Sequence, residues 1–389
     1  MLTDLHHLIH APQFQAKPLS ALFFAFTLRM VAISLVAVFI PVYIVNLTGD
    51  FVYVLWYLAA FSFFTILLAI PLGWVVNYLG FRRSVLASSL ALVGYFLLLE
   101  SAAQNPILIY AVSFLEAVKL LLFWIPYHLI FLEDGDHKHF EREVSIPVVL
   151  ARLTAVGAPL LGGFLIVRLG FSALFNWGIV LVLASSLPLF LMPHHKHGPF
   201  PGWRHILAQT FKGKYFSLFL SFWGVRNVAI VAGIIWPVFL FGLAGDSYSE
   251  LGLITSGVLL VSALAALLVG KFASQLKEKA ILKLGAWINA LVWLLKVLVQ
   301  TPVAAFLTDS LNKLTDVLHV IPFDALTYKK ALVKKHPSEF IIRREILLHF
   351  GGLISTLLMI FLWQQGVPLP AFFAFASVGY LASILLVAS

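Results

Sequence analysis

The chain has 389 residues and a formal net charge of +9, and 61% of its residues are hydrophobic while 11% are charged. Soluble domains carry roughly 25% charged residues, so this composition excludes an ordinary soluble protein. The sequence has no cysteine, which excludes disulfide bonds and thiolate metal sites.

Apolar blocks of about 20 residues or more alternate with short polar stretches, and this length matches the hydrocarbon core of a bilayer. The first block has no small-residue cleavage pattern and is longer than a signal-peptide core, so we expect it to remain as a span. The sequence predicts an all-α polytopic membrane protein with twelve transmembrane helices. The expected spans are 18–46, 51–79, 84–101, 106–132, 144–167, 172–192, 215–243, 249–270, 280–299, 302–331, 340–363 and 368–389.

The basic residues predict the orientation of these spans, because loops rich in Lys and Arg stay in the cytoplasm. With both termini placed inside, nineteen of the 26 Lys and Arg residues fall in cytoplasmic segments, and Arg168 is the one that falls in an outer loop. This asymmetry accounts for the positive charge, so we expect no nucleic-acid partner. We expect a bacterial-type inner (plasma) membrane.

An internal duplication groups the helices. Residues 41–50 read PVYIVNLTGD and residues 237–246 read PVFLFGLAGD, with five of ten positions identical at an offset of 196. Further matches at offsets of 196 or 197 pair Ile125-Pro126 with Ile321-Pro322, Gly73 with Gly270, and Arg29 with Arg226. An even number of spans separates the copies, so they insert in the same orientation. We therefore predict six-helix bundles at 1–193 and 215–389, joined by a cytoplasmic linker at 194–214.

Twelve spans in two sixes with a basic central loop resemble the major facilitator superfamily. That family carries a Gly-x-Leu-Ala-Asp-Arg-x-Gly-Arg-Lys signature between its second and third helices, and residues 73–83 here read GWVVNYLGFRR. Gly73, Gly80 and Arg82 fit the signature, whereas Asn77 replaces the acid and Tyr78 the first arginine. The resemblance implies alternating access between two bundles, with Asn77 as a neutral hydrogen-bond partner where the family has a charged latch.

The fifth expected span contains GAPLLGG at residues 157–163, which resembles the Gly-Pro-x-x-Gly-Gly element of the family's antiporters. The element favours antiport slightly. The alternative is ordinary packing, because small residues permit close helix contact and Pro159 permits a bend.

Ionisable residues inside the expected spans form the predicted substrate and proton pathway, since each costs about 2.5 to 3.5 kcal/mol near the middle of a bilayer. In the resembled fold, helices one, four, seven and ten line the central cavity, and most of these residues lie on those helices. The predicted pathway consists of Arg29, Glu116, Lys119, Arg152, Arg226, Asp309, Lys313 and Asp316.

Two roles follow for this set. Glu116 or Asp316 is a candidate proton-coupling carboxylate. Arg29 and Arg226, which correspond in the duplication, are expected to face each other and bind an anionic or carbonyl-bearing substrate. The alternative is that Glu116 pairs with Lys119, and Asp309 or Asp316 with Lys313, only to hold helices together.

Charged residues at the cytoplasmic ends of the spans predict an inner gate that breaks when the halves rock. A solvated surface is the alternative reading. The predicted gate consists of Gly73, Asn77, Arg82, Arg83, Glu141, Arg142, Glu143, Arg343, Arg344 and Glu345.

No nucleotide-binding, zinc-protease or nucleophile motif is legible in the sequence, so we expect no enzyme activity, no catalytic residues, no cofactor and no metal site. His128 and His319 lie within spans, as proton relays or as hydrogen-bonded interior side chains. We predict a monomeric secondary transporter for a small organic solute, with proton-coupled export favoured. The alternatives are a symporter or facilitator of an organic anion, or a non-transporting scramblase, receptor or intramembrane enzyme.

Overall fold

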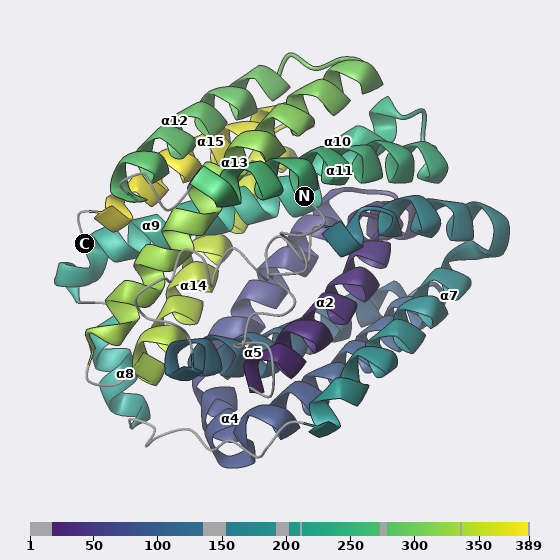
Figure 1. Cartoon of the computed structure of the whole chain (residues 1–389). Coiled ribbons are helices and arrows are strands. Elements are labelled where there is room, and N and C mark those ends of the chain that lie inside the picture. Colours follow the sequence, from purple (N-terminus) through teal and green to yellow (C-terminus); the bar gives the residue numbers. More distant parts are fainter. Residues whose placement is uncertain are drawn as a thin grey trace.

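The computed structural model describes residues 18–134, 153–191, 202–210, 212–272, 278–334 and 337–387. These residues form a bundle of helices, and no strand occurs among them (Figure 1). Within the described part of the chain, eight helical segments are long and apolar enough to cross a membrane. A helix satisfies all its backbone hydrogen bonds internally, which is what lipid requires of a spanning segment. The prediction of an all-helical membrane protein is confirmed.

The first half of the chain supplies five α-helices. They are α2 (Pro18–Ala37), α3 (Ile40–Thr48), α4 (Val52–Ser101), α5 (Ile109–Asp134) and α7 (Ala158–Ser186).

Two of these helices are each broken at one glycine. Gly80 in α4 has φ 74° and Gly170 in α7 has φ 82°, in the left-handed region that glycine enters without steric cost. At 50 residues, α4 is long enough for two passes of about 20 residues each. The breaks fall between expected spans two and three and between expected spans five and six.

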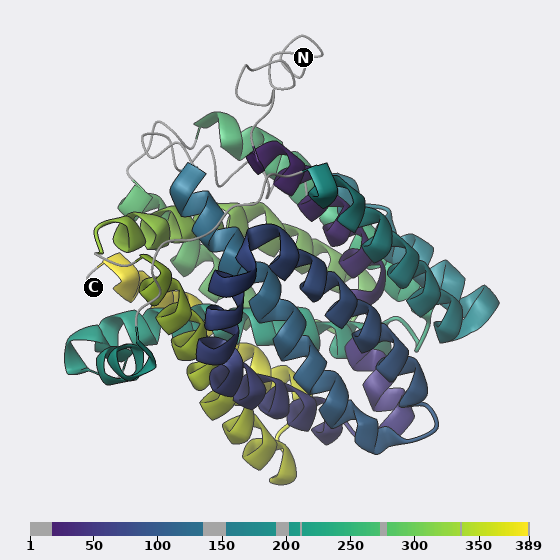
Figure 2. The same ribbon diagram turned by 90° about the horizontal axis from the view of Figure 1, so that it is seen from below.

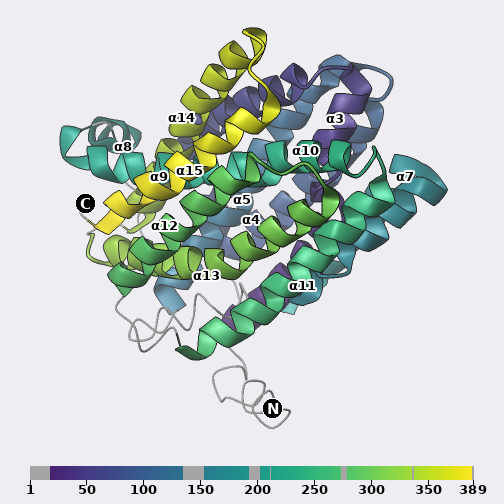
Figure 3. The ribbon, with the colours of Figure 1, turned by 90° about the horizontal axis from the view of Figure 1, so that it is seen from above.

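The second half begins after a short helix, α8 (Trp203–Thr210), which lies at the edge of the bundle (Figure 3). After α8 come two helices, 216–230 and 236–243, and a five-residue π-helix (Val231–Ile235) connects them. The α-helices of this half are α9 (Phe216–Ile230), α10 (Trp236–Leu243), α11 (Tyr248–Phe272), α12 (Glu278–Lys296), α13 (Pro302–Leu332), α14 (Pro337–Gln364) and α15 (Phe373–Ser383).

Corresponding helices of the two halves pack together in the same way, and further helix pairs join one half to the other. In the first half α2 packs on α7, and in the second half α9 packs on α14. Contacts between the halves come chiefly from α4 against α14 and from α7 against α11. Figure 2 shows the purple-to-teal helices of the first half beside the green-to-yellow helices of the second.

Small residues set the spacing at the crossing of α7 and α11. A Cβ added to Gly163 would lie 2.4 Å from the Tyr248 carbonyl oxygen, and one added to Gly252 would lie 2.4 Å from the Pro159 carbonyl oxygen. On the other side of α7, a Cβ on Gly162 would lie 2.3 Å from the Leu35 carbonyl oxygen of α2. Gly162 and Gly163 of the GAPLLGG element therefore permit close backbone contact with α2 and α11.

One end of the bundle, which we call the Asp50 end, carries the turns between α3 and α4 and between α10 and α11. There Asn46 Nδ2 donates to the Tyr248 hydroxyl at 2.5 Å, and Trp363 Nε1 donates to Asp50 Oδ1 at 3.1 Å. The rings of Phe51 and Trp363 pack with centroids 5.1 Å apart. All three contacts join the first half to the second, so the halves are closed against each other at this end. We call the opposite end, at the Gly80 break, the Arg83 end.

Candidate functional site

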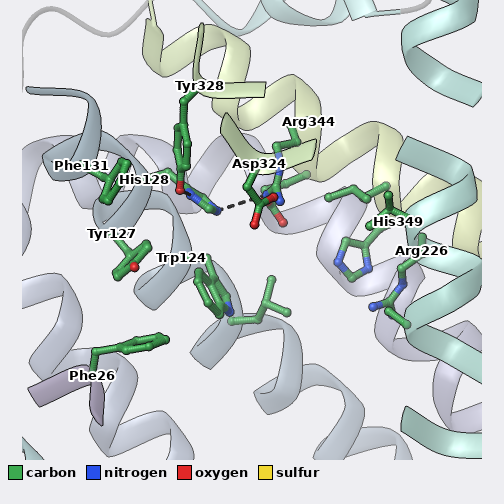
Figure 4. A pocket seen from close by; sticks show the side chains of 15 residues that line it. Phe26, Trp124, Tyr127, His128, Phe131, Arg226, Asp324, Tyr328, Arg344 and His349 are labelled. Carbon is green, nitrogen blue, oxygen red and sulfur yellow. Dashed lines mark hydrogen bonds and ion pairs between the residues drawn. The ribbon is translucent and has the colours of Figure 1, made fainter. Parts of the chain in front are cut away.

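A cavity of about 270 Å³ lies between the two halves (Figure 4). Its walls are Phe26 of α2, five residues of α5, three of α9, two of α13 and four of α14. These residues come from the middle of the helices and from their Arg83-end portions. The cavity is thus walled by both halves and lies on the side of the bundle away from the closed Asp50 end.

The duplicated Ile-Pro pairs precede two of the cavity's polar residues. Pro126 lies inside α5 and Pro322 inside α13, and each removes one backbone donor from its helix. Two residues after each proline come His128 and Asp324, which both line the cavity. The repeat therefore brings an imidazole from one half and a carboxyl group from the other to the same space.

An aromatic wall lines the first-half side of the cavity. The Tyr127 ring lies 5.3 Å from that of Phe26 and 5.2 Å from that of Trp124, while Phe131 stacks on Tyr127 at 6.3 Å between centroids. Such side chains offer a large apolar surface with few polar atoms. The wall suits a solute with an apolar or aromatic body.

A hydrogen-bonded bridge crosses from the first half to the second at the cavity's edge. His128 Nδ1 and the Tyr328 hydroxyl are 2.6 Å apart, and Arg344 Nη1 lies 3.2 Å from His128 Nε2. Phe131 stacks on Tyr328 with ring centroids 4.7 Å apart. The bridge joins α5 to α13 and α14, so any separation of the halves at the Arg83 end must break it.

The charged groups of the cavity are unevenly paired. Arg344 Nη1 donates to Glu345 Oε1 at 2.5 Å, and Asp324 lies beside this pair (Figure 4). Arg226 lies on the other side of the cavity next to His349, and its guanidinium carbon is 5.0 Å from the centroid of the Phe61 ring. The cavity thus has an acidic and basic cluster at one side and a cation with an imidazole at the other.

Of the predicted pathway residues that the structure describes, Arg226 is the one that lines this cavity. Its repeat counterpart Arg29 lies inside the first half, where it is 4% exposed. Arg29 donates to Ser88 Oγ at 2.8 Å and to Ser89 Oγ at 3.3 Å, and it lies over the ring of Phe123 at 4.4 Å. The structure therefore does not bring the two arginines to face each other across the cavity.

Glu116 and Lys119 form an ion pair at 2.9 Å within α5, and the ammonium group of Lys119 lies 4.6 Å from the centroid of the Tyr95 ring. Both side chains are mostly buried in the first half. The negative charge of Glu116 attracts both Arg29 and Arg226.

Asp309 and Asp316 of α13 face other helices of the second half. Asp309 Oδ1 accepts from Lys296 Nζ of α12 at 2.6 Å, so its ion-pair partner is Lys296 and not the Lys313 that sequence spacing offered. The Tyr380 hydroxyl of α15 donates to Asp316 Oδ1 at 2.8 Å. His319 contacts Ser383 Oγ at 2.7 Å and is a hydrogen-bonded interior side chain.

The predicted gate residues are dispersed. Arg82 donates to the Phe190 carbonyl oxygen at 3.4 Å, and Arg83 is exposed. Arg343 approaches Glu339 of its own helix at 3.6 Å. Lys329 of α13 pairs with Glu278 of α12.

Other predicted gate residues sit elsewhere or are not described. Gly73 is buried and Asn77 is half-buried on α4. Arg344 and Glu345 line the cavity. The predicted residues Glu141, Arg142, Glu143 and Arg152 lie outside the described residues.

Three functional candidates escaped the sequence prediction of the pathway: His128, Asp324 and His349. His128 was recognised only as a possible relay. Asp324 carried a usable signal, because it occupies the repeat position of His128 two residues after an Ile-Pro pair. Among the described residues, no group of three or more His, Cys, Asp or Glu side chains could hold a metal ion.

A bundle of membrane-spanning helices in two halves, with a cavity between them that is closed at one end, defines the class of secondary transporters. The chain belongs to the Major Facilitator Superfamily, because the model of that family matches residues 22–311. The resemblance inferred from the sequence is confirmed, and the chain is a transporter, not an enzyme.

Solved structures similar to this chain share its fold. The E. coli fucose:proton symporter FucP has 14% sequence identity and a TM-score of 0.69, covering 95% of this chain and 98% of that chain. A structure of FucP in the outward conformation gives the same values. The human organic anion transporter MFSD10 (TETRAN) has 15% identity, a TM-score of 0.69 and the same coverage. No curated protein matches the sequence.

Proposed function

We propose that the chain moves a small organic solute by proton-coupled secondary transport, with the cavity as the solute site. The observation that carries this proposal is a cavity walled by both halves while the halves are closed together at the Asp50 end. In alternating access the two bundles rock about a central site, which opens first to one side and then to the other.

The orientation and the number of crossings are part of the proposal. The distribution of Lys and Arg favours a cytoplasmic Arg83 end and cytoplasmic termini, in a bacterial-type inner membrane. Twelve crossings follow if α4 is divided at Gly80 and α7 at Gly170. With the bundles at 1–193 and 215–389 and a linker at 194–214, a monomer contains a complete solute site. The described state then faces inward.

Proton coupling requires a carboxyl group whose protonation depends on the state of the transporter. We propose Asp324 as the first candidate, because it lines the cavity beside Arg344, and we keep Glu116 and Asp316 as candidates from the sequence. Replacement of each by its amide in turn, followed by transport assays with and without a pH gradient, identifies the coupling group. The proposal of proton coupling fails if all three variants keep gradient-driven transport.

Export is the direction that we propose, on the resemblance of residues 157–163 to the antiporter element. The close contacts of Gly162 and Gly163 explain two of these residues by packing alone, so the direction depends on the transport assay. The names of the structural neighbours include both a fucose:proton symporter and an organic anion transporter. An organic anion is accordingly the second candidate substrate.

The natural chain has no cysteine, which makes alternating access directly testable by pairs of introduced cysteines carrying spin labels. Gln104 and Gln300 are exposed near the Asp50 end, and Arg83 and Lys279 are exposed near the Arg83 end. Electron–electron distance measurements on each pair are made in lipid, at two pH values and with candidate solutes.

The expected result is reciprocal: the Gln104–Gln300 distance lengthens under the conditions in which the Arg83–Lys279 distance shortens. Flux into or out of proteoliposomes is measured with the same protein. Rigid distances at both ends under all conditions, together with absence of flux for every solute tested, would show that the chain does not transport by this mechanism.

A further inference from the structure

Arg226 and His349, which line the cavity, and the neighbouring Ser62 each carry a buried polar atom without a hydrogen-bond partner among the described residues. Among the described residues, no hydrogen-bond partner meets Nε of Arg226, Nδ1 of His349 or Oγ of Ser62. Ser62 is 0% exposed and His349 is 2% exposed. A buried polar group without a partner costs about 1 to 3 kcal/mol, so three together indicate a group that is bound there in another step of the cycle.

The surrounding helices hold these atoms together. The Phe61 ring of α4 packs against both His349 and Arg226. Its centroid lies 4.9 Å from that of the His349 ring and 5.0 Å from the guanidinium carbon of Arg226. Gly352 of α14 leaves room for the arginine: a Cβ there would lie 2.9 Å from Arg226 Cγ and 3.4 Å from Ser62 Oγ. Residues of α4, α9 and α14 thus converge from both halves of the molecule, and Figure 4 shows Arg226 and His349 side by side in the cavity wall.

Charge distinguishes this corner from the rest of the cavity. Arg344 has Glu345 at 2.5 Å, whereas no acid of the described residues forms an ion pair with Arg226. Glu116 and Glu345 act on Arg226 only from a longer range. A desolvated cation is costly unless an anion neutralises it, so this corner favours a negatively charged ligand group.

The remainder of the cavity is chemically different. Its first-half wall includes Phe26, Trp124, Tyr127 and Phe131, which offer aromatic faces and no formal charge. A ligand that satisfies both regions has an anionic head and an apolar or aromatic body.

We propose that Arg226, His349 and Ser62 form an anion subsite, and that the transported solute is a small aromatic or apolar organic anion, such as a carboxylate. Arg226 supplies the charge and a guanidinium N–H, His349 supplies a ring N–H from Nδ1, and Ser62 donates its hydroxyl. The inference rests on the proposed transport function and names the class of substrate for the same cavity.

The test uses the purified full-length chain and a series of arylalkanoic carboxylates, each matched with its neutral amide. Binding is measured by isothermal calorimetry. We expect carboxylates to bind at least tenfold more tightly than their amides. Arg226→Gln is expected to weaken carboxylate binding by about tenfold to hundredfold, the loss of one charge-assisted hydrogen bond, and to leave amide binding within about twofold.

Matched variants separate recognition from folding. Arg168 is an exposed arginine away from the cavity, and Arg168→Gln is expected to bind both members of each pair like the unaltered protein. Ser62→Ala removes one donor without removing charge and is expected to weaken carboxylate binding by about fivefold. This variant also tests the subsite if Arg226→Gln does not fold.

Two outcomes overturn the subsite: no carboxylate in the series binds, or carboxylates and amides bind equally in the unaltered protein and in Arg226→Gln. Counterflow in proteoliposomes separates this inference from the proposed function. Flux of a neutral solute with no carboxylate binding refutes the subsite and leaves transport standing. Carboxylate binding that depends on Arg226 without flux of any bound compound supports the subsite and refutes transport.

Discussion

Asp309 and Lys296 form a buried ion pair whose disruption has a predictable energetic cost. Lys296 is 0% exposed, its Nζ lies 2.6 Å from Asp309 Oδ1, and the same ammonium group lies 3.8 Å and 4.2 Å from the rings of Trp293 and Trp236. At an effective dielectric constant of about 20, charges at the 2.6 Å separation attract by about 6 kcal/mol. Desolvation of both groups offsets most of this attraction in the intact protein.

Removal of one partner leaves the other charge buried without compensation. Asp309→Ala is therefore expected to lower the free energy of unfolding by about 3 to 5 kcal/mol. The two indole rings stabilise the remaining ammonium group by about 0.5 to 2 kcal/mol each, which is too little to replace the carboxylate. In the double variant Lys296→Met with Asp309→Ala, no charge remains, and we expect a smaller loss than in Asp309→Ala alone.

The measurement is unfolding by sodium dodecyl sulfate in mixed micelles, followed by tryptophan fluorescence, to which Trp293 and Trp236 contribute directly. Lys313→Met is the control, at a position one turn after Asp309 on α13. Lys313 is more exposed than Lys296, so it is expected to contribute less to the free energy of unfolding. A double-mutant cycle with zero coupling, in which the two single losses simply add, would refute the reasoning.

Three further predictions concern the contacts between the halves. Tyr248→Phe removes the hydroxyl that accepts from Asn46, which weakens closure of the Asp50 end by about 1 kcal/mol; the spin-label pair at that end should show more of the longer distance, and an unchanged distribution contradicts this. Gly163→Val forces α7 and α11 apart and should cost about 1 to 3 kcal/mol in unfolding measurements, whereas Gly157→Ala, where a Cβ meets open space, should be nearly neutral. His128→Phe removes the hydrogen bonds of His128 with Tyr328 and Arg344, so the Arg83–Lys279 spin-label pair should show a larger population at long distance. Equal populations in the two proteins would exclude a role for these hydrogen bonds in closing the Arg83 end.

Much of the fold was predictable because the thickness of the bilayer fixes the length of each apolar segment that crosses it. Long apolar blocks, the bias of Lys and Arg, and the repeated segments at 41–50 and 237–246 led to a helical membrane protein of this superfamily without knowledge of any contact. Gly80, which fits the signature between the second and third expected spans, is also the residue at which α4 breaks. The expectation that helices one, four, seven and ten line the central cavity came from the resemblance to the superfamily.

The candidate site was predictable only in part. The argument that a charge inside the membrane needs a partner or water selected Arg226, which lines the cavity. The same argument selected Arg29, Glu116, Asp309 and Asp316, whose nearest polar partners lie within a single half. The hydropathy pattern shows that a charged residue lies within an expected span, but it does not indicate which neighbouring helix the side chain faces.

The sequence by itself determined the solvent of this protein, its helical class, its duplication and its family, because these depend on composition and on spacing along one chain. The tertiary structure decided which polar side chains share a space. His128, Arg226, Asp324 and His349 come from four helices far apart in sequence, and only the rotation and packing of those helices turn their side chains toward one cavity. A helix rotated by a single residue, about 100°, would direct the same side chains to lipid or to another helix.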